Sequence, residues 1–260
     1  MKTKPIMSNK YLSFVSDEHL IKCISNLHAA YLNKKNTITR KVFYKNKIDT
    51  IKLLFDAKFN EIDEEDLVGA EMLRQVDKSI NNFIGTFHEE LLGGIKGFER
   101  GKQSGYDIRA VDDTLFAEIK NKHNTMDSSS QESVFQKLAR YADTHKKAKC
   151  YWVQIFAKKS FNVPWQGQIN SKEYGHSRVH KISGDQFYAM LTGIDDAMMQ
   201  VYKVLPNAID EYLSTMEPSE AIAEHSAFTE IQGAAKKAGR TILNQITAEN
   251  YPYYMGSKEL

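Results

Sequence analysis

Two acidic residues and a lysine in the middle of the chain have the types and spacing that phosphodiester hydrolysis needs. Ten residues separate Asp107 from Glu118, and Lys120 follows Glu118 at the second position. A divalent cation held by carboxylates promotes such hydrolysis, because it polarises the phosphoryl oxygen and lowers the pKa of an attacking water. Mg²⁺ prefers oxygen ligands, and a nearby lysine can orient the water, help to deprotonate it or stabilise the developing charge. The set therefore predicts a magnesium-dependent centre with Asp107 and Glu118 as metal ligands and Lys120 as the catalytic cation.

Two predicted strands position these side chains. Residues 106–111 (YDIRAV) and 114–120 (TLFAEIK) have the apolar and β-branched character of strands. The pair Asp112 and Asp113 between them is a common turn signal. In an antiparallel hairpin, the start of the first strand lies beside the end of the second. We therefore expect the three functional groups to meet at one end of a sheet.

The surroundings of Glu118 support this prediction. Side chains two residues apart lie on the same face of a strand, so Glu118 and Lys120 should project side by side. Ala117 and Ile119 then face the core. An unpaired carboxylate inside the apolar stretch LFAEIK would be costly, and the strand leads directly into a polar, basic run over 121–125. The bare spacing is weaker evidence, because it also arises by chance on solvent-facing strands.

The remaining segments predict a helical first third, an α/β centre and a helical end. Helices are expected at 17–33, 37–58, 63–92, 131–145, 184–193, 195–215 and 228–248. Further strands are expected at 149–157 and 178–182, with 160–177 as a polar, irregular segment. We find no internal repeat and no linker rich in proline or glycine. The expected organisation is a single domain over 1–260, with a helical part at 1–80, a catalytic core at 81–193 and a helical part at 194–260.

Composition and charge limit the classes of protein. Hydrophobic residues make up 42% of the 260 residues, enough for a substantial core. Only two cysteines occur, and neither a signal peptide nor a membrane-spanning stretch is recognisable, so we expect a cytoplasmic protein without membrane contact. Basic side chains prevail in 1–60 and 101–190, whereas acidic ones prevail in 61–100 and 191–260. This distribution suits a protein with one face toward a polyanion.

The stretch SGYDIRAVDDTLFAEIKNKHNT, residues 104–125, resembles the active-site hairpin of type II restriction endonucleases of the PD-(D/E)XK superfamily. More narrowly, it resembles the group that cuts GGNCC or GGWCC sites. Residues 80–94, 149–158 and 180–193 are also similar to that group, so the resemblance spans most of 80–193. It implies an α/β fold, a restriction-endonuclease-like core in which helices flank a central mixed β-sheet, with helical additions at both ends.

The resemblance also implies roles for single residues and partners. Asp107 and Glu118 match the family's metal ligands, and Lys120 matches its catalytic lysine; the signature proline is replaced by Tyr106. Many members use a further glutamate from the preceding helix, for which Glu89 and Glu90 are candidates, with Glu90 preferred. Such enzymes are usually homodimers that cut both strands of palindromic double-stranded DNA. A prokaryotic defence system, in which a cognate methyltransferase protects host DNA without stable binding, is the implied setting.

Contacts with DNA are expected from two segments. Asn121, Lys122 and Asn124 follow the catalytic strand and should contact phosphates near the cut. Residues 165–181 are rich in groups that read bases or bind phosphates, with Lys172, Arg178 and His180 as the leading candidates. A plain polar surface loop is an equally good interpretation of that segment.

Two other functions remain compatible with these residues. The first is a structure-specific nuclease, such as a junction resolvase or repair nuclease, on the same fold. The second is a DNA-binding protein without catalysis, in which the acids are structural. The intact Asp107, Glu118 and Lys120 set argues against the second, because a binding module gains nothing from acids that face a phosphate.

Overall fold

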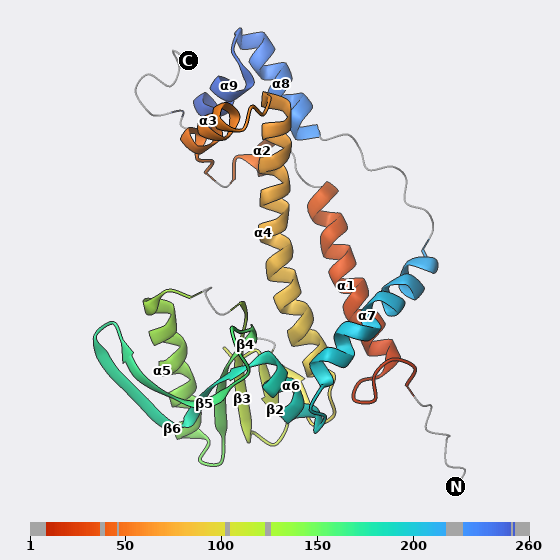
Figure 1. Cartoon of the computed structure of the whole chain (residues 1–260), viewed down its shortest axis with the longest axis vertical. Helices are drawn as coiled ribbons and strands as arrows, with labels where there is room; N and C mark the ends of the chain where they lie inside the picture. The colour runs from red at the N-terminus through yellow and green to blue at the C-terminus, as the bar shows by residue number, and fades with distance from the viewer. Residues whose placement is uncertain are drawn as a thin grey trace. The chain divides into compact units, whose positions relative to one another are not determined.

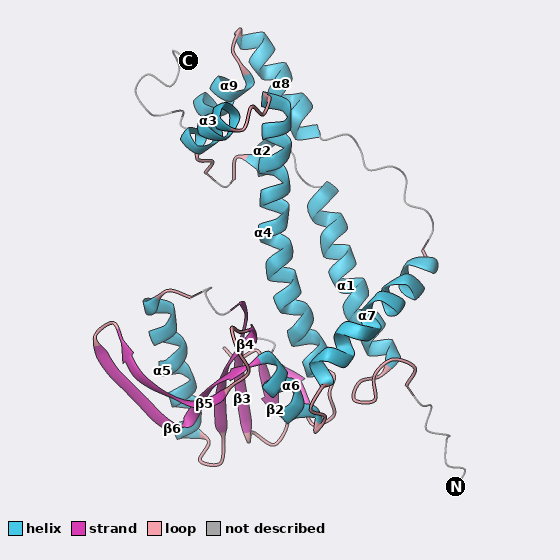
Figure 2. Cartoon of the chain, in the orientation of Figure 1, coloured by secondary structure: helices cyan, strands magenta, loops and turns pink. Residues whose placement is uncertain are grey.

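The two strands predicted around Asp107 and Glu118 form an antiparallel pair within a six-stranded sheet (Figure 2). The computed structural model describes residues 9–36, 40–45, 47–101, 105–122, 126–216, 226–250 and 252. The chain divides into one compact unit made of 1–28 and 82–217, and a second made of 29–81 and 218–260. The sheet and the predicted catalytic residues belong to the first unit. The described part of the second unit is helical (Figure 1).

The sheet mixes parallel and antiparallel neighbours. Its strands are β1 (Phe98–Arg100), β2 (Ile108–Ala110), β3 (Leu115–Lys122), β4 (Lys149–Phe156), β5 (Asn162–Ile169) and β6 (Lys172–Ser183), in the order β1-β2-β3-β4-β6-β5. Strands β3, β4 and β6 are parallel, and antiparallel pairs complete both edges. This mixed sheet with flanking helices confirms the fold class expected from the sequence.

The helices follow the predicted order with two corrections. They are α1 (Asp17–Asn36), α2 (Arg40–Phe43), α3 (Thr50–Phe59), α4 (Glu64–Gly93), α5 (Ser128–Thr144), α6 (Gly184–Thr192), α7 (Ala197–Ser214), α8 (Ser226–Ala238) and α9 (Ile242–Asn250). The helix expected at 37–58 is interrupted, because Asp49 caps a new helix by accepting the Lys52 amide. The helix expected at 228–248 is also two helices, since Gly239 has a φ of 65° and ends α8.

The segment 160–177, expected to be irregular, is largely a β-hairpin. Strands β5 and β6 join through Asn170 and Ser171, whose φ angles of 50° and 62° suit a two-residue turn. Trp165 and Ile169 on this hairpin are buried in the cluster that also contains buried side chains of α5. Figure 1 shows the hairpin beside α5. The polar composition of the segment reflects its other face, which is exposed.

Both faces of the sheet are covered, so alternate residues of β3 enter different cores. Leu115, Ala117 and Ile119 pack in a cluster with α1, α4, α6 and α7. Phe116 packs in the second cluster, with α5. The two cysteines are buried one in each cluster, Cys23 in the first and Cys150 in the second. A separate cluster of α2, α3, α4, α8 and α9 residues forms the core of the helical unit. Across the described residues, no helix has the length and apolar character to cross a bilayer.

Candidate active site

Asp107 is fixed beside β3 by two hydrogen bonds. Its backbone amide donates to the Ala117 carbonyl at 2.9 Å, which extends the antiparallel pairing of β2 with β3 by one residue. Its side-chain Oδ2 accepts the Ile119 amide at 2.6 Å. The two partners flank Glu118 in the chain. The hairpin therefore brings Asp107 next to the Glu118–Lys120 pair, as the sequence predicts.

Glu118 is buried on the face of β3 that α5 covers, with an exposed fraction of 8%. Its Oε1 accepts Lys120 Nζ at 2.8 Å, and its Oε2 accepts Lys137 Nζ at 2.6 Å. Lys137 lies on α5, and its side chain and that of Lys120 are each about a third exposed. A buried carboxylate requires compensation of this kind, and the two ammonium groups supply it.

The charges of the site perturb one another. Burial raises the pKa of Asp107, the Glu118 carboxylate raises it further, and the Ile119 amide and nearby lysines oppose the rise. Burial lowers the pKa of Lys120, but the hydrogen bond to Glu118 and the charges of Glu118, Asp107 and Glu89 outweigh it, so the pKa is raised overall. Lys120 is therefore a cation at neutral pH. Two carboxylates and two lysines thus lie together at this centre, and the Glu118 charge repels that of Asp107.

Of the two glutamates near the end of α4, Glu89 is the one that interacts with this centre. Burial and then the Asp107 charge raise the pKa of Glu89, while Arg100 and Lys120 lower it. Glu90 instead accepts the Asn26 amide of α1 at 3.0 Å, and the two glutamates share Arg100. Glu89 therefore interacts electrostatically with Asp107, whereas Glu90 is the residue preferred on the sequence as the additional acid.

The polar residues after Glu118 are only partly within the described chain. Asn121 lies against Gly85 of α4, and its side-chain oxygen is buried without a hydrogen-bond partner. Lys122 is exposed at the end of β3, opposite Phe156. Asn124 lies outside the described residues. Among the described residues of this stretch, the side-chain oxygen of Asn121 is the buried polar atom that calls for a further partner.

The other predicted DNA contacts do not gather at this centre. Arg178 donates to the carbonyls of His145, Lys146 and Ala148, so its guanidinium holds the turn between α5 and β4. His180 pairs with Asn162 and stands opposite Tyr151, near the start of β4. Lys172 is exposed and lies 3.7 Å from Glu132.

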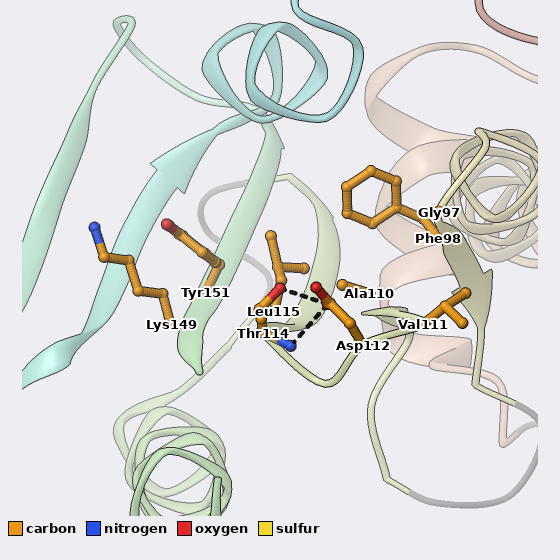
Figure 3. A pocket seen from close by; sticks show the side chains of 9 residues that line it. All are labelled: Gly97, Phe98, Ala110, Val111, Asp112, Thr114, Leu115, Lys149 and Tyr151. Carbon is orange, nitrogen blue, oxygen red and sulfur yellow. Dashed lines mark hydrogen bonds between the residues drawn. The ribbon is translucent and has the colours of Figure 1, made fainter. Parts of the chain in front are cut away.

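A hollow of about 600 Å³ opens at the opposite end of β3 (Figure 3). Phe98, Ala110, Leu115 and Tyr151 contribute to its lining. Its one carboxylate, Asp112, accepts the amide and the hydroxyl of Thr114 at 3.2 Å and 2.6 Å. The lining thus lacks the pair of acids that phosphodiester hydrolysis needs.

Comparison with known proteins identifies the family of the chain. The family model of the Eco47II restriction endonuclease matches residues 12–214, which include the whole sheet and α1 to α7. The chain belongs to the Eco47II restriction endonuclease family. It is 42% identical to the type II restriction enzyme Sau96I of Staphylococcus aureus, over 95% of this chain and 97% of that protein. It is 30% identical to the type II restriction enzyme Eco47II of Escherichia coli, over 78% of this chain and 88% of that protein.

Membership of the Eco47II family confirms the expected enzyme class, a type II restriction endonuclease. Among the described residues of this family member, no group of three or more acidic, histidine or cysteine side chains is arranged to hold a metal ion.

The sequence did not point to Lys137. The residue precedes Leu138, which α5 buries, and follows Val134 by three positions, so it adjoins the buried stripe of that helix. A lysine beside a buried stripe is usually solvated. Only the packing of α5 on β3 shows that this ammonium reaches Glu118, which is 19 residues away in the chain.

Proposed function

We propose that this chain is a Mg²⁺-dependent endonuclease that hydrolyses phosphodiester bonds in double-stranded DNA at a short G/C-rich palindrome of the GGNCC kind. The observation that carries the proposal is the hydrogen bond from the Ile119 amide to Asp107, beside the Glu118–Lys120 pair. The resemblance of residues 104–125 to enzymes that cut GGNCC or GGWCC sites supports the recognition sequence.

The donor set fits Mg²⁺. Asp107 and Glu118 offer only oxygen ligands. Burial and then the Glu118 charge raise the pKa of Asp107, and a cation would relieve the repulsion between the two carboxylates. Bound Mg²⁺ would supply Lewis acidity and lower the pKa of the attacking water. Asp107 and Glu118 would hold it.

Lys120 acts as a cation in this proposal. Because its pKa is raised, its ammonium group is a hydrogen-bond donor at neutral pH rather than a free base. It would orient the attacking water and stabilise the negative charge that develops on the phosphate oxygens. Asn121, Lys122, Asn124 and Lys172 are proposed to contact the DNA. Arg178 and His180 remain weaker candidates, since both side chains already have protein partners.

Glu89 is proposed as the additional acid of the site. We expect Glu89→Gln to lower the rate of cleavage by at least about tenfold, because it removes a charge that interacts with Asp107 and Lys120. Glu90→Gln is the matched control, since both residues bind Arg100. Single-turnover rates at saturating Mg²⁺ would measure the difference. If Glu90→Gln lowers the cleavage rate more than Glu89→Gln does, Glu90 is the additional acid of the site.

A homodimer is proposed as the active form, and α7 offers a surface for it. One side of α7 is buried in the main core through Ala197, Val201 and Ala208. On the other side, exposed residues recur at alternating steps of three and four; they are Met199, Tyr202, Pro206, Ile209 and Leu213. Tyr202 is 71% exposed. An apolar stripe with this heptad spacing is typical of helices that pack against another helix.

A second copy of α7 in antiparallel orientation would match this stripe. With the two-fold axis near Pro206, Met199 of one copy would face Leu213 of the other. Lys203 of one would then approach Asp210 of the other, and neither residue forms an ion pair within the described part of its own subunit. The stripe is thus complementary to itself in shape and in charge.

The α7 surface can be tested by introducing a charge. We expect Ile209→Asp or Leu213→Asp to convert a dimer into a 29.7 kDa monomer in sedimentation at micromolar concentration. The buried carboxylate would lack a partner across the interface. Ser214→Asp, one residue beyond the stripe, should leave the dimer intact. If both stripe variants remain dimers, α7 does not form the dimer interface.

The proposed setting is the cytoplasm of a prokaryote, with a methyltransferase that modifies the same sequence and protects the host DNA. No stable complex between the two enzymes is required, because the DNA carries the protective mark.

Digestion of a sequenced plasmid tests the function. Discrete fragments that require Mg²⁺ would support site-specific cleavage, and sequencing of the fragment ends would identify the recognition site. Cleavage of branched DNA in preference to palindromic duplex would favour a structure-specific nuclease. Magnesium-independent binding without cleavage would favour a DNA-binding protein without catalysis.

A further inference from the structure

Each carboxylate oxygen of Glu118 is bonded to a different lysine. Lys120 Nζ lies 2.8 Å from Oε1, and Lys137 Nζ lies 2.6 Å from Oε2. Charge-assisted bonds of this kind are among the stronger hydrogen bonds in proteins. A metal ion that uses Glu118 as a ligand must therefore compete with both ammonium groups, because they neutralise the carboxylate and repel a further cation.

Lys137 is the cation that this centre has beyond the expected catalytic set. It comes from α5, whereas Asp107 and Glu118 come from the β2–β3 hairpin and its approach. Its charge also acts on Asp107, so it lies close to both proposed metal ligands. A lysine in that position opposes the binding of a divalent cation as long as it stays there.

A DNA phosphate can draw Lys137 away from Glu118. About 30% of the lysine side chain is exposed, so a ligand in solution can reach this side chain, whereas Glu118 is buried. Phosphate oxygens are frequent partners of lysine in protein–DNA complexes. Exchange of a carboxylate oxygen for a phosphate oxygen keeps the number of charge-assisted bonds unchanged and frees Oε2 of Glu118.

We propose that Lys137 is a positioning residue that occupies Glu118 until DNA binds, and thereby couples metal binding at this carboxylate to the presence of a phosphate. The inference rests on the proposed function, in which Glu118 is a metal ligand. Lys137 does not take part in bond breaking. Its position determines whether Glu118 is free to bind the metal ion.

The affinity of the DNA-free protein for Mn²⁺, measured by electron paramagnetic resonance of the free ion, tests this coupling without any cleavage. We expect Lys137→Met to bind Mn²⁺ about tenfold more tightly than the wild type, because a competing charge-assisted bond is absent. Lys137→Arg retains a cationic donor and should bind as weakly as the wild type. Lys147→Met removes an exposed lysine after the far end of α5 and is the matched control. Lys137→Gln replaces Lys137→Met if thermal unfolding shows the methionine variant to be unfolded.

The coupling itself can be measured in the Lys120→Met background, where cleavage is expected to be absent. A short DNA duplex should strengthen Mn²⁺ binding in this background, and much less so when Lys137→Met is added. Equal or weaker Mn²⁺ binding by Lys137→Met than by the wild type would overturn the inference. If Glu118→Gln leaves Mn²⁺ binding unchanged, Glu118 is not a metal ligand and the proposed site itself fails.

Discussion

The Glu118→Gln variant is expected to cleave DNA at least about a thousandfold more slowly than the wild-type protein. Glutamine keeps the shape of the side chain but loses the negative charge. In the variant, Lys120 and Lys137 both lose their carboxylate partner, and Asp107 is left as the single charged member of the two proposed metal ligands. The digestion of the mapped plasmid site in Mg²⁺, followed as a single-turnover rate, measures the loss.

Controls separate this loss from misfolding. Asp107→Asn and Lys120→Met should be impaired as severely as Glu118→Gln, whereas all three should bind the duplex in gel-shift experiments without Mg²⁺. Glu99→Gln is the matched control, because Glu99 pairs with Arg109 on β2 outside the centre. Wild-type rates in the Asp107, Glu118 and Lys120 variants would exclude this site from the chemistry.

Acid is expected to destabilise the fold through His88. This histidine of α4 is buried, its Nδ1 lies 2.8 Å from the Tyr188 hydroxyl of α6, and burial lowers its pKa from the ordinary value of 6.5 to about 4. Above pH 6.5 the imidazole is neutral in the folded and unfolded states alike. Between pH 6.5 and 4 only the unfolded chain takes up the proton, so stability decreases as the pH falls. The difference between the His88 pKa values of the unfolded and folded states corresponds to about 3 kcal/mol in the free energy of unfolding.

Urea unfolding at a series of pH values between 7.5 and 4 measures this effect. His88→Asn keeps a polar group near the position of Nδ1 but cannot be protonated, so its stability should depend less steeply on pH. Tyr188→Phe removes the hydroxyl and keeps the buried imidazole, and should retain the steep dependence. Equal slopes for the wild type and His88→Asn would show that other groups govern the acid response.

The catalytic hairpin could be predicted from the sequence because its determinants are local. The two-residue spacing of Glu118 and Lys120 fixes a common face, and the Asp112–Asp113 turn fixes the pairing that returns Asp107 to the end of β3. The burial of Glu118 was not evident in the same way. It depends on α5, whose packing on β3 is a tertiary contact.

The choice between Glu89 and Glu90 depends on the rotation of α4. Neighbouring residues on a helix point about 100° apart, so a small change in the helix orientation exchanges their surroundings. The orientation is fixed by the burial of Phe87, Leu91 and Leu92 in the core around the sheet. The sequence shows that the apolar residues Phe87 and Leu91 lie near Glu90 on the helix. It does not show which face of the sheet these two residues cover.

The β5–β6 hairpin escaped prediction because its apolar signal is sparse. Trp165, Ile169 and Tyr174 supply most of its contact with α5, and exposed polar residues separate them. A strand that buries one side chain in four has too little periodicity to identify from composition. The residues Asn170 and Ser171 are a more informative local signal than the apolar pattern, because they form the two-residue turn, in which both φ angles are positive.

The two buried cysteines give the protein a practical property. Burial raises the pKa of Cys23 and of Cys150 to about 12, so at neutral pH almost none of either thiol is in the nucleophilic thiolate form. Maleimide dyes should therefore react with neither Cys23 nor Cys150. A single cysteine introduced on the surface, such as Glu173→Cys beside the hairpin turn, would be labelled selectively. The native chain already serves as a thiol-silent background for fluorescence experiments on DNA capture.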